Sequence, residues 1–457
     1  MLKNLKYISV VLERGRCSWG RCYFCGWGNR YVNSSITSLM NKFKHVISKR
    51  KDEEVLKIFC SGSFLDERQF PRDFVYWCLA QAEKAGFKHV VIESRPEFIR
   101  EEVLQELTVF NIKIHVAIGL EIADDHVLNE YYRKGMKFID YLRAVKLLHD
   151  KGFYVRTYVL VNGHPILYNN PTYHKTLIRE TLDKVNDLSD SIVVINAYPH
   201  SNSLLFKDWL IMRWRPLSYE EFINIVGEYV NDSKIEIDFN NFNFIPRFPR
   251  ELRIKIEGVG CDIVKHPYFE IWQDYIQRFY KVPPDKEYVL FLPCTYVKPY
   301  RRSITHRKIL SVIFRTSVYK KIQLVVVSTP GVIPYEYHDM YPFESYDWPE
   351  WLETPEIMKC YIEVTKDRVK RFIENCCRNV KLFIAYFHKN SETLQAIREA
   401  VEELGLKDKF IEVIDDETFK EIVRDLGTGK KLGSSILRHD KALKKLEEVL
   451  IKCVSSS

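Results

Sequence analysis

Cys17-Ser-Trp-Gly-Arg-Cys22-Tyr-Phe-Cys25 follows closely on Lys6–Glu13, an apolar run whose Val and Ile residues predict a buried strand. Three thiolates on one short loop can ligate three irons of a [4Fe–4S] cube and leave the fourth iron open to an outside ligand. An open iron of this kind suits an enzyme that binds S-adenosylmethionine (SAM) and lets the cofactors supply radical chemistry. Cys17, Cys22 and Cys25 are therefore the predicted cluster ligands.

Zinc is the alternative interpretation of these cysteines. A structural zinc site takes four protein ligands, usually as two pairs. The nearest histidine, His45, lies in a separate helical pattern, and the scattered cysteines offer no second C-x2-C pair. The ligand count therefore favours the iron–sulfur cluster.

The composition is that of an ordinary globular protein, with 46% hydrophobic and 28% charged residues in 457. No apolar run approaches the ~20 residues that span a bilayer, so we expect a cytoplasmic protein with no membrane partner. Eleven cysteines in a long chain without an export signal favour reduced thiols and metal ligation over disulfides. The net charge of +8 weakly favours an anionic partner such as RNA. Candidate contacts to an RNA backbone are Arg213, Arg215, Lys430 and Lys431.

Strand and helix patterns alternate over residues 1–245. The strand candidates are Lys6–Glu13, Val55–Ser61, His89–Glu93, Lys113–Leu120, Tyr154–Val161 and Ile192–Tyr198. The helical patterns between them include Arg72–Lys84, Glu101–Val109, Phe138–His149 and Tyr173–Leu188. Six such units predict an α/β fold, a partial (β/α)6 barrel with its active-site residues at the C-terminal ends of the strands.

A second, smaller α/β domain is predicted for residues 287–457. Residues 246–286 break the pattern, and Pro283–Pro284 marks the expected domain boundary, so this stretch is interpreted as a connecting segment. The predicted strands are Tyr288–Leu292, Gln323–Ser328 and Val380–Tyr386, and the predicted helices are Glu356–Cys376, Glu392–Leu404 and Asp440–Val454.

Polar residues follow the predicted strands of the first domain. Because the carboxyl ends of parallel strands meet at one edge, these residues are candidate cofactor ligands, and for each a structural role is equally open. They are Ser61, Gly62 and Ser63 after the second strand, Glu93 and Arg95 at the third, Glu121 at the fourth, and Arg156 and Tyr158 on the fifth.

These motifs carry a resemblance to a known family. The stretches are CSWGRCYFCGWG, IFCSGSFLDERQFP, VIESRPEFI, VAIGLEIADDHVLNEYYRKG and RTYVLVNGHP. Together they resemble the radical SAM subunit of archaeosine synthase, which is itself similar to the radical SAM domain of the Elongator catalytic subunit. The match covers about Lys6 to Gly260. Two departures stand out: the cysteine spacing is one residue longer than the commonest radical SAM spacing, and the family's Lys-Pro-Pro-Phe motif is here Asn162-Gly-His-Pro.

A second signature opens the C-terminal domain, Pro293-Cys294-x3-Lys298-Pro-Tyr-x2-Ser303-x2-His306. It offers a nucleophile, a cation and a base at a strand end, although Cys294 could equally be a buried thiol and Ser303 a helix cap. The pattern resembles the signature of the lysine-adding subunit of archaeosine synthase, a relative of tRNA-guanine transglycosylase. Ser328-Thr-Pro-Gly, Tyr341-Pro342 and Tyr346-Asp347 extend the resemblance.

The two resemblances imply a lyase that forms archaeosine from 7-cyano-7-deazaguanine in the D-arm of tRNA. Free lysine first adds to the nitrile; His306 is the candidate acid–base residue, Lys298 the electrostatic one, and attack by the Cys294 thiolate is an open option. SAM, held by Ser61, Glu121 and Arg156, then yields a radical that takes hydrogen from the lysine side chain, and the C–N bond breaks. An electron donor is implied as a partner.

Two alternatives remain open. The C-terminal domain is either catalytic or a docking module that recruits a separate, tRNA-guanine transglycosylase-like subunit to add lysine. The other alternative is Elongator-like modification of a wobble uridine, which ranks lower because the second half shows no glycine-rich acyl-CoA loop.

Overall fold

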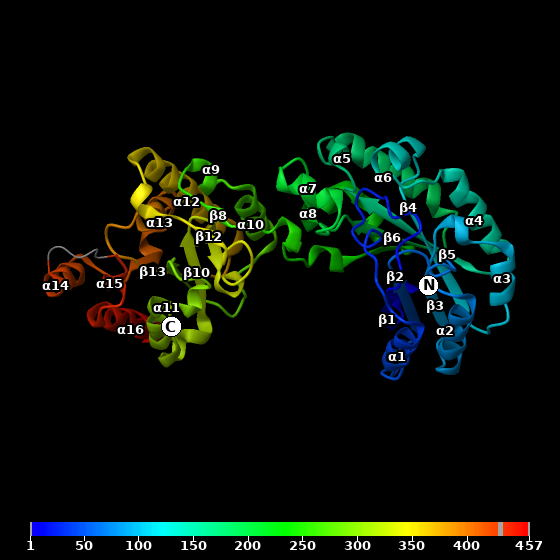
Figure 1. Ribbon diagram of the computed structural model, residues 1–457, viewed down its shortest axis with the longest axis horizontal. Helices are drawn as coiled ribbons and strands as arrows, with labels where there is room; N and C mark the ends of the chain where they lie inside the picture. Colours follow the sequence, from blue (N-terminus) through cyan, green and yellow to red (C-terminus); the bar gives the residue numbers. More distant parts are fainter. Residues whose placement is uncertain (1, 428–432, 456–457) are drawn as a thin grey trace. The chain divides into compact units, whose positions relative to one another are not determined.

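The computed structural model describes residues 2–427 and 433–455. The chain divides into two compact units, Met1–Phe244 and Ile245–Ser457 (Figure 1). No helix in the described residues is long and apolar enough to cross a membrane.

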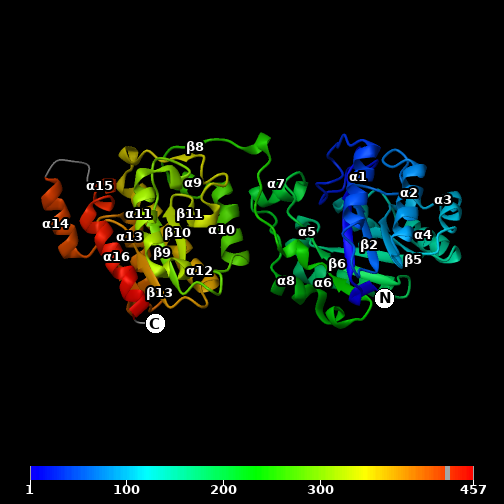
Figure 2. The ribbon, with the colours of Figure 1, turned by 90° about the horizontal axis from the view of Figure 1, so that it is seen from below.

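The first unit is built on a parallel sheet whose strands follow one another in chain order, β1 to β7, within the described residues. Right-handed crossovers between sequential strands place the helices on one face, and Figures 1 and 2 show α2, α3 and α4 outside the sheet. The strands are β1 (Tyr7–Leu12), β2 (Val55–Cys60), β3 (His89–Glu93), β4 (Lys113–Glu121), β5 (Tyr154–Val161), β6 (Ser191–Asn196) and β7 (Ile235–Ile237). The helices are α1 (Ile36–Ile47), α2 (Arg72–Lys84), α3 (Glu101–Leu107), α4 (Phe138–Asp150), α5 (Pro165–Tyr168), α6 (Pro171–Asn186), α7 (Leu204–Leu210) and α8 (Tyr219–Val226).

The predicted partial barrel is confirmed, and it gains a strand. The six expected strands are present, and β7 adds a short edge strand that pairs with β6 from Ile192↔Ile235 to Val194↔Ile237. β7 was not predicted because three residues, one of them the charged Glu236, give too little pattern to recognise.

The concave face of this sheet carries charged side chains. Glu236 of β7 accepts from Arg156 of β5 (Nη2–Oε2, 2.5 Å) and lies 3.5 Å from Lys57 Nζ of β2. Strands β2, β5 and β7 are not neighbours, so these side chains can meet only across the hollow of the half-barrel. Burying Arg156 and Lys57 there is tolerated because Glu236 compensates their charge.

The second unit has a smaller mixed sheet in the order β11-β10-β9-β13-β14. All pairs are parallel except β10 with β11. The strands of the unit are β8 (Ile256–Glu257), β9 (Tyr288–Pro293), β10 (Ile322–Ser328), β11 (Gly331–Pro334), β12 (Tyr346–Asp347), β13 (Leu382–Ala385) and β14 (Phe410–Glu412). The helices are α9 (Cys261–Val264), α10 (Pro267–Phe279), α11 (Ile304–Arg315), α12 (Pro355–Cys376), α13 (Glu392–Glu403), α14 (Asp416–Leu426), α15 (Gly433–Leu437) and α16 (Asp440–Ser455).

β9 lies at the point where the strand order reverses. The chain runs from β9 through α11 to β10 on one side, and returns through α12 to β13 on the other side of β9. In open α/β sheets the crevice for a ligand forms at the carboxyl end of the strands at such a switch point. Cys294, the residue after β9, stands there.

The segment 246–286 is part of the second unit, contrary to its interpretation as a connecting segment. Helix α10 within it buries Phe269, Trp272 and Ile276. Glu270 of the same helix accepts from the buried Arg368 of α12 at 2.5 Å. This packing makes α10 a structural part of the unit, and Pro283–Pro284 is a turn inside it.

One pair of scattered cysteines forms a disulfide, which corrects the expectation that the thiols are reduced. Cys261 at the start of α9 is bonded to Cys360 of α12, across 99 residues of sequence. The two cysteines meet because α9 packs against α12, a contact that their separation in sequence does not reveal.

Candidate functional sites

The three clustered cysteines lie on the loop between β1 and α1. The loop is closed at its base by paired backbone hydrogen bonds between Gly15 and Val32. Gly28 donates its N–H to Cys25 Sγ at 3.3 Å, and a Cβ at Gly28 would lie 3.1 Å from Cys17 Cβ. Glycine at position 28 therefore lets this part of the loop pack close to two of the three cysteines.

The cysteine loop is attached to the loop that follows β2. Gln69 makes reciprocal bonds with Arg14: its backbone oxygen accepts from Nη1 at 2.6 Å, and its Nε2 donates to the Arg14 oxygen at 3.0 Å. Gln69 Oε1 accepts from Ser63 N, and a Cβ at Gly62 would come within 2.1 Å of that oxygen. Gly62 and Ser63 thus pack against the Gln69 side chain that holds the two loops together. Sequence analysis did not select Gln69 as a functional residue.

The three thiols of the cysteine loop are free and lie within electrostatic reach of one another. No three His, Cys, Asp or Glu side chains in residues 2–427 and 433–455 are placed to share one metal ion. None of Cys17, Cys22 and Cys25 forms a disulfide in the described residues. The thiol of Cys25 lies within electrostatic reach of both Cys22 and Cys17. Three free thiols on one loop are the ligand set that a [4Fe–4S] cube with one open iron takes, and this ligation stays a prediction.

A buried ion pair lies beside Cys22. Lys134 Nζ donates to Glu121 Oε1 at 2.6 Å, and each side chain is 9% exposed. Glu121 has a positive φ of 71°, an unfavourable conformation for this residue type. Burial raises the pKa of Cys22 to about 11, whereas Lys134 and Arg95 act in the opposite direction. Lys134 therefore favours the thiolate that a metal ligand must be.

Three of the buried polar atoms that have no partner within the described residues lie at the carboxyl ends of strands. They are Ser61 Oγ after β2, Asn162 Oδ1 after β5 and Asn196 Oδ1 at the end of β6, each unpartnered within the described residues. A buried polar atom without a hydrogen bond is costly and calls for a ligand or water. The edge of the sheet that carries the cysteine loop therefore has unsatisfied groups that a ligand or water could partner.

The other predicted cofactor ligands already have protein partners. Ser63 Oγ accepts from Arg95 N, and the Arg95 guanidinium donates to the Lys134 and Gly135 carbonyls at 3.0 and 3.2 Å. Arg156 faces Glu236 in the hollow of the sheet.

Glu93 and Tyr158 are joined on the same concave face. Glu93 accepts from Cys60 N at 2.9 Å and from the Tyr158 hydroxyl. Burial raises the pKa of Glu93 to about 7. For these two residues, as for Ser63, Arg95 and Arg156, a contact with SAM stays a prediction.

In the second unit, Cys294 is surrounded by groups that can move a proton. Its thiol is hydrogen-bonded to Ser328, and Lys298 Nζ lies 3.9 Å from the ring centroid of Tyr346. Burial raises the pKa of Cys294, and Ser328 and Lys298 oppose it. Burial also lowers the pKa of Lys298.

Hydroxyl groups extend this cluster. The Tyr346 hydroxyl lies 2.5 Å from Ser328 Oγ and 2.8 Å from the Tyr300 hydroxyl. Cys294, Ser328, Tyr346 and Tyr300 therefore form a continuous chain of hydrogen-bonding groups. We name Cys294, Lys298, Ser328 and Tyr346 the thiol–lysine cluster.

Ser303 and His306 hold this region in place. Ser303 Oγ accepts from His306 N and caps α11. The fully buried His306 has its Nε2 at 2.9 Å from the Pro293 carbonyl and its Nδ1 at 3.4 Å from the Tyr335 hydroxyl. With both ring nitrogens engaged, His306 fixes the end of β9, an arrangement that differs from the expected acid–base role.

Comparison with known families now identifies the first unit. Residues 15–170 match the model of the radical SAM superfamily. Over these residues the first unit matches a radical SAM domain. Its cofactors are a [4Fe–4S] cluster and SAM, in agreement with the cysteine loop. Residues 270–428 match a domain of unknown function, DUF5591.

Curated relatives carry the names of both archaeosine synthase subunits. Subunit beta of Thermococcus kodakarensis is 29% identical over 197 residues, 41% of this chain and 56% of the relative. Subunit beta of Methanosarcina acetivorans is 26% identical over 46% of this chain and 63% of the relative. Subunit alpha of Thermoplasma acidophilum is 31% identical over 44% of this chain and 42% of the relative. The chain thus spans about half the length of the relatives it matches.

Solved structures also resemble part of the chain. A queuine lyase from Clostridium spiroforme bound to SAM and queuine covers 51% of this chain and 90% of its own, with 19% identity and a TM-score of 0.37. A methylornithine synthase covers 44% of this chain and 57% of its own, with 17% identity and a TM-score of 0.35.

The basic residues expected to contact RNA differ in their surroundings. Arg213 is exposed and lies 3.8 Å from Asp208, and Arg215 Nε donates to the Tyr168 hydroxyl at 2.9 Å, both within the radical SAM domain. Lys430 and Lys431 lie outside the described residues. Contact of these residues with RNA stays a prediction.

Burial of His306 should make the free energy of unfolding depend on pH. Burial lowers its pKa to about 4, whereas an unfolded histidine titrates near 6.5. Between these values the unfolded chain binds a proton that the folded chain refuses, so stability falls as the pH falls, by up to about 3 kcal/mol. In urea titrations from pH 7 to 4, His306→Gln should show a shallower pH dependence than the unsubstituted protein. His45→Gln, at an exposed position on α1, should keep the original slope, and an equal slope for His306→Gln would refute the assignment.

Proposed function

We propose that the chain forms archaeosine in tRNA as a bifunctional enzyme. Its second unit adds lysine to the nitrile of 7-cyano-7-deazaguanine in the D-arm, and its radical SAM domain then cleaves the lysine adduct as a lyase. One observation carries the proposal: a radical SAM domain and a second reactive cluster lie in one chain whose relatives are named for both subunits of archaeosine synthase. The partners are tRNA, free lysine and an electron donor.

Lysine addition is assigned to the thiol–lysine cluster. The neutral ε-amine of lysine attacks the nitrile carbon, a C–N bond forms, and the nitrile nitrogen takes up a proton. Lys298 is the proposed proton donor, because its lowered pKa makes it a better acid than an ordinary lysine. The Ser328–Tyr346–Tyr300 chain of hydroxyl groups is the proposed acceptor of the proton that the attacking amine loses. His306 is proposed as a positioning residue in this scheme.

Cleavage of the adduct is assigned to the radical SAM domain. When bound, the cluster and SAM supply a 5′-deoxyadenosyl radical that takes hydrogen from the lysine side chain. Cys17, Cys22 and Cys25 would hold the cluster, and Ser61 and Asn196 would bind polar groups of SAM with atoms that are otherwise unpartnered in the described residues. Breakage of the lysine C–N bond then releases the lysine carbon chain as an alkene, and one electron from the electron donor with one proton converts the nitrogen radical left on the tRNA to the formamidine of archaeosine.

The experiment separates the two steps. Anaerobically reconstituted protein is given tRNA that carries 7-cyano-7-deazaguanine, with lysine but without SAM, and nucleosides are measured by mass spectrometry. A lysine adduct supports addition by the second unit; SAM and a reductant should then convert it to archaeosine with release of 5′-deoxyadenosine. If only tRNA that already carries lysine is converted, the second unit is a docking module for a separate lysine-transferring subunit. If neither substrate reacts, the proposal fails.

Lys298→Met should slow lysine addition by about 100-fold or more, because positioned proton donors typically contribute that much. SAM cleavage on tRNA that already carries lysine should be unchanged. Lys359→Met, at an exposed position of α12, is the matched control and should add lysine at the normal rate. Cys294→Ser tests the covalent option in the same assay: full lysine addition by that variant would exclude a thioimidate on Cys294.

A further inference from the structure

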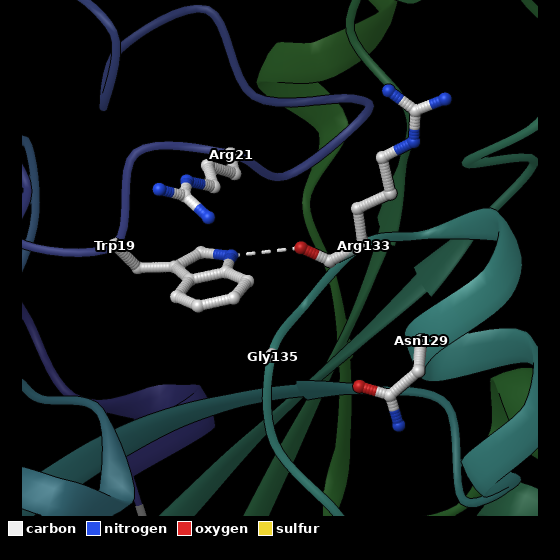
Figure 3. A pocket seen from close by; sticks show the side chains of 5 residues that line it. All are labelled: Trp19, Arg21, Asn129, Arg133 and Gly135. Atoms are coloured by element: carbon white, nitrogen blue, oxygen red, sulfur yellow. Dashed lines mark hydrogen bonds between the residues drawn. The ribbon is translucent and has the colours of Figure 1, made fainter.

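A surface hollow of about 420 Å³ lies beside the cysteine loop of the radical SAM domain. Trp19, Arg21, Asn129, Arg133 and Gly135 line it (Figure 3). Two of these residues stand between Cys17 and Cys22 in the sequence, so the hollow is continuous with the loop that holds the predicted cluster ligands.

Close contacts between the cysteine loop and residues 133–135 hold the wall of the hollow in one conformation. Trp19 Nε1 donates to the Arg133 carbonyl at 2.7 Å, as the dashed line in Figure 3 shows. A Cβ at Gly135 would lie 2.1 Å from the indole ring, so only glycine lets the two segments approach. Arg133 has a positive φ of 51°, which is uncommon for a residue with a side chain. Such a backbone persists where the surrounding contacts enforce it, and it often marks a binding site.

The charge of the hollow is positive and uncompensated. Within the described part of the chain, neither Arg21 nor Arg133 forms an ion pair, whereas Arg30, Arg72 and Arg95 each face a carboxylate. Arg21 lies 5.5 Å from the ring centroid of Trp19, and Figure 3 shows its guanidinium beside the indole.

The positive surface continues beyond the hollow. Arg133 lies 5.4 Å from the ring centroid of Tyr23, and both Arg133 and Arg213 are within electrostatic reach of that tyrosine. The nearby carboxylate of Asp208 accepts from the Tyr23 hydroxyl and is itself buried. Asp208 also lies 3.8 Å from Arg213, so Arg133 is the guanidinium on this side that has no ion pair within the described residues.

We propose that this hollow binds a backbone phosphate of the RNA substrate, close to the nucleotide that enters the radical site. Guanidinium groups bind phosphate through paired hydrogen bonds, and the half-buried indole of Trp19 next to them offers a stacking surface for the sugar or base. A phosphate bound in this hollow would lie next to the cysteine loop. A base flipped out of the RNA stack near that phosphate could then reach the cofactors. This inference rests on the proposed function, because it requires RNA as the substrate.

The test measures binding of a labelled tRNA transcript by fluorescence anisotropy over a range of salt concentrations. Loss of one phosphate contact should reduce the slope of log K against log[salt] by about 1. We expect this reduction for Arg133→Gln and for Arg21→Gln, and its recovery in Arg133→Lys. Arg143→Gln, which removes an exposed charge from α4, should keep the full slope.

The [4Fe–4S] absorbance and the affinity for SAM are measured on the same protein samples. Both should be unchanged in Arg133→Gln. A weakened affinity for SAM with an unaltered salt slope would assign the hollow to the cofactor and overturn the proposal. An unaltered slope in both variants, while the unsubstituted protein binds tRNA, would overturn the phosphate site alone. Failure of the unsubstituted protein to bind tRNA would overturn the proposed function together with this site.

Discussion

Cys22→Ala should abolish the [4Fe–4S] signal and reduce SAM cleavage to the background level. A cube held by three thiolates loses one of its iron ligands in this variant, and no other cysteine of the loop can replace it. Iron and sulfide content, absorbance near the charge-transfer bands and electron paramagnetic resonance after reduction measure the cluster. Formation of 5′-deoxyadenosine measures the cleavage.

The matched control is Cys78→Ala. Cys78 is fully buried in α2, away from the cysteine loop in sequence, so its loss leaves a small cavity and no missing ligand. This variant should retain the cluster and the cleavage activity. Normal iron content and SAM cleavage in Cys22→Ala would remove the central assignment of the cysteine loop.

Lys134→Met should lower the free energy of unfolding of the radical SAM domain by about 3–5 kcal/mol. The substitution leaves the Glu121 carboxylate buried without its partner, and removal of one member of a buried ion pair has this cost. The measurement is a urea titration of the full chain without cluster, followed by far-ultraviolet circular dichroism. Because Lys134 also favours the thiolate of Cys22, the variant should take up less iron during reconstitution.

Two further variants make this prediction specific. Adding Glu121→Gln to Lys134→Met removes the unpaired charge and should restore part of the lost stability. Lys146→Met breaks an exposed pair with Asp150 on α4 and should leave the urea midpoint nearly unchanged. Equal effects of Lys134→Met and Lys146→Met would show that the buried pair has no special role.

The parts of the fold that could be predicted are those with a local signal. Strands β2 to β6 are runs of five to nine mostly apolar residues, and each stands out by composition. β7, β11 and β14 have three or four residues, which is too short for periodicity to register. Segment 246–286 was assigned to a linker for the same kind of reason: prolines mask α10, whose buried face is recognisable only once α12 is placed against it.

The site residues also fall into those with a local sequence signal and those that depend on contacts between distant segments. The three cysteines and Cys294 stand out in the sequence because one short motif contains each group, and their roles stay predictions. Lys134 could not, because its pairing with Glu121 depends on a loop path that the contact of Trp19 with Gly135 fixes. Arg156 was expected to bind SAM from its place on a strand, but its partner Glu236 belongs to the strand that the sequence did not reveal.

The disulfide between Cys261 and Cys360 sets a condition for handling this protein. The cluster cysteines must stay reduced to bind iron, whereas this bond is open to exchange with added thiols. A thiol reagent added during cluster assembly therefore acts on the second unit as well as the first. Cluster assembly without added thiol, with sulfide limited to the amount that the cluster takes up and with electrons from a donor that does not exchange with disulfides, would load one unit and spare the covalent link of the other.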